Sequence, residues 1–444
     1  MKKVIALLLS AVLLLGLTAC AGTKDQSSAK PEVENVASDS GAQNPNEAST
    51  RPYEGVKLSF WWPPFGRNEE MSYWTERFAG FEEETGAEVS ITVVPWEDMS
   101  TKYMAGFMSD EGPDVFYMTN EITYDMAEAG ALLNLTPHFT EEEIANQLFW
   151  KTGYTVGNEV YSLPVFGGVD YRGMHFNMDI LKSAGITDVP TTWDEVIDAT
   201  LKIKEAGVCE YPILFPINDS NSAVMCTYIP MLYSAGGSIL NENGDAPALD
   251  SQAALDAAQF LYDLSNKYEV LSKNAVTLGE ENVVELFVEG KVAMATLPPA
   301  LVLGVDKDFE YYSNAGVSKA GCDVVTFSGY DALSVNANSK NLDAAIALLK
   351  YIVSTEGRED FRANYEPSVG AMNADMQPTV YDEECVTETV ATIAEHGRPL
   401  PVCKGLPSII EAIKTNEQLL VMGDITPEEA CKAMQTSAVL AVED

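Results

Sequence analysis

The chain has 444 residues and a formal net charge of −40, because 67 Asp and Glu outnumber 27 Lys and Arg. A surface this acidic repels phosphate backbones and anionic headgroups, which argues against nucleic-acid binding and against a polybasic membrane contact. Apolar residues make up 46% of the chain. This content is enough to build hydrophobic cores and excludes disorder of the whole chain, and the length favours two or three domains.

The first 20 residues have the pattern of a secretory signal. Lys2 and Lys3 precede an apolar run over residues 4–17, which is too short to span a membrane. The run leads into LTAC at residues 17–20, which resembles a bacterial lipobox. This resemblance implies cleavage before Cys20 and lipid on its thiol. An ordinary signal peptide followed by a chance cysteine is the alternative.

Residues 21–51 are rich in Ser, Ala, Asn, Glu, Lys and Pro and contain hardly any large apolar side chains. Such a segment cannot bury enough surface to offset the entropy lost on folding. We therefore expect a signal peptide over residues 1–19, a lipidated Cys20 with a disordered tether over residues 20–52, and a globular body from Tyr53 onward. The protein would be held at a membrane and would face the extracellular or periplasmic side.

Six cysteines follow Cys20, none of them in a C-x-x-C motif and none close in sequence to a histidine: Cys209, Cys226, Cys322, Cys385, Cys403 and Cys431. This spacing supports neither a zinc site nor a redox motif, so we expect no metal and no cofactor. An even number of cysteines outside the cell permits disulfides. Buried free thiols are the slightly preferred alternative.

The body opens with strand and helix patterns in alternation. Period-two alternation predicts strands, and apolar residues at helical spacing predict helices. The predicted order is a strand over 56–61, a helix over 74–85, a strand over 88–94, a helix over 99–107, a strand over 114–118 and a helix ending near Gly130. This order indicates a doubly wound α/β sheet, in which ligands bind beyond the carboxyl ends of the strands.

The later part of the chain predicts further helices and then a return to strands. A capping box from Thr192 to Glu195 begins a helix that runs to Gly207, and Thr426 caps another. Helices are also predicted over 251–268 and 342–353, and strands over 292–297, 324–327 and 332–335. This late return to strand patterns indicates lobes assembled from discontinuous segments.

A series of short motifs runs through the body in a defined order: WW at 61–62, ERFAGFE at 76–82, GPDV at 112–115, GALLNLT at 130–136, YSLPV at 161–165, FN at 176–177, PTTWDE at 190–195, FVEGKVAM at 287–294 and the helical segment 345–361. On these motifs the chain resembles family 1 extracellular solute-binding proteins. These are lipid-anchored receptors of ATP-binding-cassette (ABC) importers, related to the maltose-binding protein class. The resemblance covers residues 56–444.

The resemblance implies an α/β, two-lobed, periplasmic-binding-protein-like fold of type II. Each lobe would be a doubly wound sheet flanked by helices, and crossing hinge segments would join the discontinuous lobes. Carried onto this chain, it gives lobe 1 as 53–119 plus 297–331 and lobe 2 as 121–295 plus 333–444, with crossings near Asn120, Thr296 and Ala332. The implied protein is a monomer that captures a small solute reversibly in the interlobe cleft and delivers it to membrane permease subunits.

Candidate ligand contacts in the first half follow strand ends. The segment WWPPF at 61–65 has more aromatic surface than a loop needs, and sugar rings stack on aromatic faces. We expect Trp62 and Phe65 to face the ligand, while Trp61 is equally consistent with a core strand. After the third strand, Asn120 is the better candidate because Tyr117 can be a core residue.

The second group of candidates lies further along the chain: Asp170, Tyr171, Tyr228, Tyr233, Tyr330 and Asp331. A carboxylate at Asp170 could accept two hydroxyl hydrogen bonds, and an internal ion pair with Arg172 is the equal alternative. One of Tyr228 and Tyr233 is expected to face the ligand. Tyr330 and Asp331 lie at a predicted crossing.

Two rival interpretations remain open. A secreted carbohydrate-active hydrolase needs a carboxylate pair, which 67 acidic residues always provide, but the chain has no G-x-S-x-G, H-E-x-x-H, Walker or Rossmann motif. We therefore expect no catalytic residues. A binding protein for an amino acid or peptide is the second rival, because Leu297-Pro298-Pro299 stands where many sugar-binding relatives have an aromatic residue.

Overall fold

The computed structural model describes residues 51–64, 70–109, 112–145, 154–218, 220–302, 305–364 and 397–443. The predicted lipid site at Cys20 and the predicted ligand contact at Phe65 lie outside these ranges. For residues 166–171 and for Tyr330 the backbone is described but the side chains are not.

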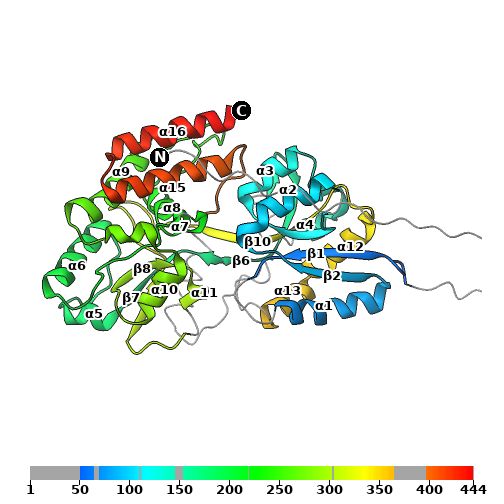
Figure 1. Ribbon diagram of the computed structural model, residues 1–444, viewed down its shortest axis with the longest axis horizontal. Helices are drawn as coiled ribbons and strands as arrows, with labels where there is room; N and C mark the ends of the chain where they lie inside the picture. Colours follow the sequence, from blue (N-terminus) through cyan, green and yellow to red (C-terminus); the bar gives the residue numbers. More distant parts are fainter. Residues whose placement is uncertain are drawn as a thin grey trace, which may run out of the picture. The chain divides into compact units, whose positions relative to one another are not determined.

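The first sheet has five strands in the order β2 (Glu88–Val93), β1 (Lys57–Trp62), β3 (Val115–Met118), β10 (Ser328–Val335) and β6 (Ser162–Tyr171). β1 is parallel to both β2 and β3, whereas β10 is antiparallel to β3 and to β6. Figure 1 shows β6 and β10 side by side. The carboxyl ends of β1, β2, β3 and β6 therefore lie along one edge of this sheet, where β10 begins.

Helices that follow the predicted pattern cover this sheet: α1 (Glu70–Thr85), α2 (Met99–Ser109), α3 (Asn120–Glu128), α12 (Leu342–Val353) and α13 (Thr355–Asn364). Trp74, Phe78 and Phe81 of α1 recur at helical spacing and are all buried. They pack with Leu58 and Phe60 of β1 in one hydrophobic core. All four residues of β3 are buried, as expected for a strand with neighbours on both sides and helices on its faces.

The second sheet has three strands in the order β8 (Met294–Leu297), β7 (Gly173–Asn177) and β9 (Tyr311–Asn314), and both pairs are antiparallel. Parallel bridges from Tyr211 to Val292 and from Leu214 to Ala295 add a further segment beside β8. The doubly wound description therefore suits the first sheet better than the second. The reason is that β7 pairs directly with β8 and β9 without a parallel crossover between them.

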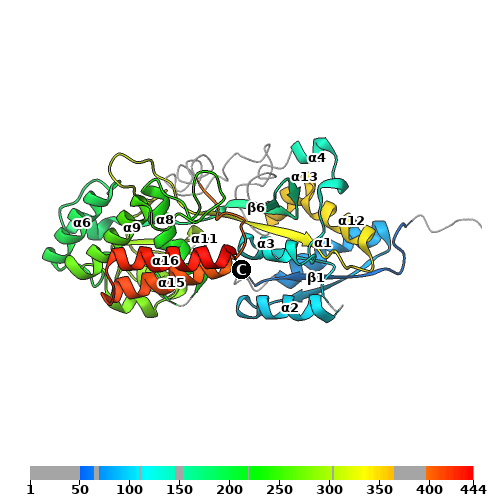
Figure 2. The same cartoon turned by 90° about the horizontal axis from the view of Figure 1, so that it is seen from above.

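Helices packed around the second sheet are α5 (Met178–Ser183), α6 (Trp193–Ala206), α7 (Asn221–Cys226), α8 (Tyr228–Ser234), α9 (Gln252–Tyr262), α10 (Glu280–Val288), α11 (Pro299–Val302), α15 (Leu406–Met422) and α16 (Pro427–Glu443). In Figure 2 the two C-terminal helices α15 and α16 lie side by side, and both contact α9. The predicted capping box of α6 is confirmed, because the Thr192 hydroxyl accepts from the Glu195 N–H and the Glu195 side chain bonds the Thr192 N–H. Gly207 ends this helix with φ +61°.

Two hydrophobic cores divide the body of the chain. One is built from residues between 58 and 165 together with residues between 333 and 361. The other is built from residues between 174 and 302 together with Phe327 and residues between 400 and 438. The chain thus passes from the first core to the second between β6 and β7, returns between Phe327 and Leu333, and reaches the second core again between Phe361 and Leu400.

The predicted lobe boundaries differ from this division. The crossings expected near Asn120 and Thr296 are wrong, because residues on both sides of each position belong to the same core. The crossing predicted near Ala332 lies in β10, inside the observed return between Phe327 of one core and Leu333 of the other. The predicted strand over 324–327 is reduced to a single bridge between Phe327 and Arg398.

Five of the six cysteines of the body are free thiols: Cys209, Cys226, Cys322, Cys403 and Cys431. Cys385 lies outside the described residues. All five are free as predicted, but only Cys226 and Cys431 are also buried, whereas the other three are partly exposed. Within the described ranges, no helix has both the length and the apolar content needed to cross a membrane.

Candidate functional site

The carboxyl edge of the five-stranded sheet gathers most of the predicted ligand contacts. β1 ends at Trp62, Asn120 follows β3, and β6 ends at Tyr171. β10 enters at this edge, with Ser328 opposite Tyr171 and Gly329 opposite Asp170. We call this the carboxyl edge, because the parallel strands of the sheet end here. In open α/β sheets ligands bind beyond this edge, so we treat it as the candidate site. The predicted residues that it brings together are Trp62, Asn120, Asp170, Tyr171, Tyr330 and Asp331.

The pairing of β6 with β10 is irregular where these residues lie. The register shifts between Gly329 and Tyr330, and again between Asp331 and Ala332. Extra residues on one strand of an antiparallel pair bend that strand and redirect its side chains, and such bulges are frequent beside binding sites. The Gly-Gly pair at 167–168 supplies the backbone freedom that an irregular strand needs.

Trp62 does not present its indole at the surface, and the prediction that it faces the ligand is wrong for this structure. Its side chain is 0% exposed and packs against Trp74, Tyr117 and Phe361 in the core. Burial along β1 alternates, so Leu58, Phe60 and Trp62 share the inner face. Trp61, on the other face, is half-buried and lies near Tyr103.

Tyr117 and Asp331 form a buried hydrogen bond at the carboxyl edge. The Tyr117 hydroxyl donates to Oδ1 of Asp331, and both side chains are at most 5% exposed. Trp96 lies in the short 3-10 helix η1 (Trp96–Asp98), which begins three residues after the end of β2, and it is edge-on to the Tyr117 ring with 5.4 Å between ring centroids. Its Nε1 donates to the carbonyl of Pro64 at 2.7 Å. Trp96 itself remains 45% exposed.

Asn120 contacts the backbone of a distant segment. Its amide donates to the carbonyl of Leu400 at 2.9 Å, and the side chain is 6% exposed. The neighbouring carbonyl of Pro399 accepts from the Tyr233 hydroxyl at 3.0 Å. Asn120 therefore lies at the predicted place, but its amide nitrogen holds the segment that leads into α15.

Tyr228 and Tyr233 are core residues, which contradicts the prediction that one of them faces the ligand. Both are at most 1% exposed, and the Tyr228 hydroxyl donates to the carbonyl of Ala254. Burial raises the pKa of both phenols well above the usual range. All residues of α8 except Pro230 are buried, so this short helix has no solvent face from which a tyrosine could reach a ligand.

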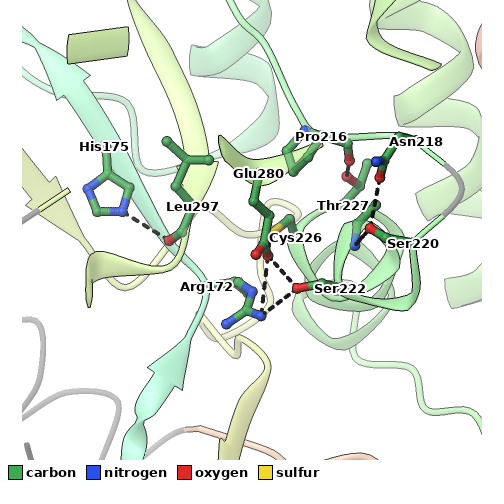
Figure 3. Close-up of polar contacts among 11 residues, drawn as sticks. Arg172, His175, Pro216, Asn218, Ser220, Ser222, Cys226, Thr227, Glu280 and Leu297 are labelled. Atoms are coloured by element: carbon green, nitrogen blue, oxygen red, sulfur yellow. Dashed lines mark hydrogen bonds and ion pairs between the residues drawn. The ribbon is translucent and has the colours of Figure 1, made fainter. Parts of the chain in front are cut away.

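Arg172 occupies the position where the chain passes from β6 to β7. Its Nη2 donates to Ser222 Oγ at 3.1 Å and lies 3.3 Å from Oε1 of Glu280. The same carboxylate oxygen accepts from the Ser222 hydroxyl at 2.5 Å and from Cys226 Sγ at 3.0 Å (Figure 3). We call Arg172, Ser222, Cys226 and Glu280 the junction cluster.

The junction cluster is largely shielded from water. The side chain of Arg172 is 4% exposed and that of Glu280 is 17% exposed. Burial raises the pKa of the Cys226 thiol, and the Glu280 carboxylate raises it further, so Cys226 stays protonated and donates. Arg172 forms an ion pair with Glu280. Its predicted alternative pair with Asp170 stays a prediction, because the side chain of Asp170 is not described.

His175 on β7 is a buried neutral imidazole. Burial lowers its pKa to about 4. Its Nε2 lies 3.0 Å from the carbonyl of Leu297, which can only accept, so the proton resides on Nε2 (Figure 3). Nδ1 then accepts from the Tyr311 hydroxyl at 2.7 Å. These bonds join all three strands of the second sheet, and His175 is a structural residue.

No group of three or more His, Cys, Asp or Glu side chains within the described residues is placed to hold a metal ion. At the carboxyl edge and the junction, the described polar side chains are hydrogen-bond donors and acceptors, such as Asn120, Asp331 and Arg172. This chemistry suits reversible binding of a solute.

Sequence reasoning missed Trp96 and the partners of Arg172. A proline and an exposed tryptophan directly after a strand would have been a usable signal for Trp96, since apolar strand residues end at Val94. Ser222 and Glu280 lie 50 and 108 residues from Arg172, so no local pattern could connect them.

Comparison with known proteins identifies the family. The sequence-family model of bacterial extracellular solute-binding proteins matches residues 66–359. A binding protein of Brucella abortus is 23% identical over 375 residues, which is 83% of this chain and 90% of its own. The diacetylchitobiose binding protein DasA of Streptomyces coelicolor is 25% identical over 376 residues, which is 80% of this chain and 78% of its own.

Solved structures share the fold. The cyclic alpha-maltosyl-1,6-maltose binding protein of Arthrobacter globiformis superposes with a TM-score of 0.73 at 18% identity, covering 87% of this chain and 99% of its own. An ABC transporter solute binding protein from Thermotoga lettingae, solved with alpha-D-tagatose, gives 0.72 at 23% identity, covering 87% and 100%. These likenesses confirm the α/β binding-protein fold. The chain belongs to the bacterial extracellular solute-binding protein family, whose members bind solutes and are not enzymes.

Proposed function

We propose that this protein is the substrate-binding lipoprotein of an ABC importer and that its solute is a small carbohydrate, bound at the carboxyl edge. The observation that carries this proposal is the family match together with the sugars bound by relatives of similar length. DasA is a diacetylchitobiose binding protein, and the Thermotoga and Arthrobacter proteins bind tagatose and a cyclic maltose derivative.

The chemistry of the carboxyl edge fits an uncharged, hydroxyl-rich ligand. A carboxylate such as that of Asp331 accepts hydrogen bonds from hydroxyls, and an amide such as that of Asn120 can both accept and donate them. The exposed indole of Trp96 offers an apolar surface at the same edge. A sugar combines both needs, because its ring has an apolar C–H face and a polar rim.

The division of the body into two hydrophobic cores supports reversible capture. Each core has its own sheet, and the chain crosses between them beside Arg172, near Ser328 and again between Phe361 and Leu400. A body of this construction can rotate about a few crossing residues, and a ligand that contacts both cores would favour the closed state. The permease would then distinguish the loaded receptor from the empty one.

The solute assignment is tested by thermal shift and calorimetry on the purified protein. The panel contains maltose, tagatose, diacetylchitobiose, an arabino-oligosaccharide, the acyclic polyol ribitol, and a set of amino acids and dipeptides. We expect at least one carbohydrate to raise the melting temperature in a concentration-dependent way, because a ligand that binds only the native state stabilises it. Stabilisation by an amino acid or a dipeptide, with none by carbohydrates, would overturn the sugar assignment but not the family.

Anchoring by lipid on Cys20 is the second part of the proposal, and the LTAC sequence at 17–20 supports it. We expect Cys20→Ser to move the protein from the membrane fraction to the soluble fraction of expressing cells. Cys322→Ser, which removes a half-buried thiol of the body, should leave the distribution unchanged. Membrane retention of Cys20→Ser at the level of the unmodified protein would disprove lipid anchoring at this residue.

A further inference from the structure

Trp96 combines high exposure with a fixed position. At 45% exposure, it is the most exposed of the tryptophans with described side chains; Trp62, Trp74 and Trp193 are all at most 7% exposed. It lies in η1 at the carboxyl end of β2, on the same edge as Asn120 and Asp331. A single exposed apolar side chain is ordinary on a protein surface. Its contacts distinguish Trp96 from such a residue.

Contacts on two sides hold the indole of Trp96 in place. Its ring N–H already donates to the Pro64 carbonyl at 2.7 Å. Its ring meets that of Tyr117 at 86°, and the Tyr117 hydroxyl is in turn fixed by Asp331. The surface of Trp96 that remains in water is therefore carbon rather than the polar ring nitrogen. Because the Trp96 side chain is already ordered, stacking of a ligand on it would cost little further side-chain conformational entropy.

We infer that Trp96 is the stacking wall of the binding site and that the ligand places the apolar C–H face of a sugar ring against it. This inference rests on the proposed function and deepens it, because it predicts selection for a cyclic sugar over an acyclic polyol of similar hydroxyl content. Tyr117 and Asp331 act as positioning residues for the wall.

The test measures the affinity of Trp96→Ala and Trp96→Phe for the carbohydrate that binds the unmodified protein, with ribitol measured alongside. We expect Trp96→Ala to bind the cyclic sugar about tenfold more weakly, equivalent to about 1.4 kcal/mol, and to change ribitol binding by less than about twofold. Trp96→Phe keeps an aromatic face and should retain most of the affinity. Sugar titration should change the tryptophan fluorescence of the unmodified protein, and Trp96→Phe should lose most of this change.

Leu440→Ala is the matched control, because it removes a 56% exposed apolar side chain from α16. It should leave sugar affinity unchanged, and the melting temperature of each variant reports whether it is folded. Unchanged sugar affinity in Trp96→Ala, or unchanged fluorescence response in Trp96→Phe, would overturn the stacking role while leaving the proposed function standing. Absence of carbohydrate binding by the unmodified protein would overturn both.

Discussion

Glu417 lies fully buried in α15, near the backbone of Tyr228, and burial raises the pKa of its carboxyl to about 8. The ordinary value is 4.5. Between these two values the native state holds a proton that the unfolded chain has lost. Stability must therefore fall as pH rises from about 4.5 to about 8, by up to about 1.4 kcal/mol per pH unit, and the full cost is present above that window.

We predict that Glu417→Gln removes this cost. The amide has nearly the shape of the protonated carboxyl and cannot ionise, so the variant should be more stable than the unmodified protein at pH 8.5 and similar to it near pH 5. Urea unfolding at both pH values measures the difference. Glu205→Gln, at an exposed position of α6, is the control and should shift stability little at either pH. A stability gain for Glu417→Gln that is equal at both pH values would contradict the titration argument.

Single side chains were the least predictable part of the site. The period-two pattern that places Leu58 and Phe60 inside extends to Trp62, so the phase of the strand already argues for its burial. The prediction that Tyr228 or Tyr233 faces the ligand failed for a different reason. Helix α8 is buried on almost every side, and the helices that bury it are distant in sequence. Local periodicity determines which face of an element is apolar, but not whether that face meets a ligand or a core.

At the scale of elements, prediction succeeded where the signal was local. The strands over residues 57–62, 88–93 and 115–118 and the helices between them agree with their patterns, as does the capped helix α6. The crossings near Asn120 and Thr296 were misplaced because lobe boundaries depend on pairing between segments far apart, such as β10 between β3 and β6. The junction cluster could not be predicted for the same reason, because it joins the β6–β7 crossing to residues far away in the sequence, namely the first residue of α10 and residues of α7.

We predict that Arg172→Met lowers the free energy of unfolding by about 3 kcal/mol, because it leaves the Glu280 carboxylate without the guanidinium that compensates its partial burial. Glu280→Gln should cost a comparable amount. The double variant should lose less than the sum of the two, which is the signature of a direct interaction.

Denaturant unfolding of the unmodified protein, the two single variants and the double variant measures this double-mutant cycle. Lys291→Met is the control, since its pair with Glu289 is about half exposed on both sides and such pairs contribute at most about 1 kcal/mol. Strictly additive losses for Arg172→Met and Glu280→Gln would show that the two residues stabilise the junction independently. In that case the ion pair would not be the feature that fixes the crossing segment.

For the molecule as a whole, the net charge of −40 sets a balance between repulsion and local attraction. Many of the described ion pairs are solvent-exposed: in Lys57–Glu88 the side chains are 78% and 66% exposed, and in Lys182–Glu310 they are 47% and 59% exposed. Exposed pairs stabilise little, whereas an excess of like charge destabilises the compact state throughout. Repulsion should therefore dominate the response to salt.

We predict that raising NaCl from about 10 mM to about 150 mM increases the melting temperature, because the Debye length falls from about 30 Å to about 8 Å and screens the repulsion between carboxylates. Choline chloride at the same ionic strength should give the same increase, since screening does not depend on which monovalent cation supplies it. A larger effect of Na⁺ than of choline would indicate a specific cation site instead. A decrease in melting temperature with both salts would mean that the ion pairs outweigh the repulsion, and that the acidic surface is held together by its 27 basic residues.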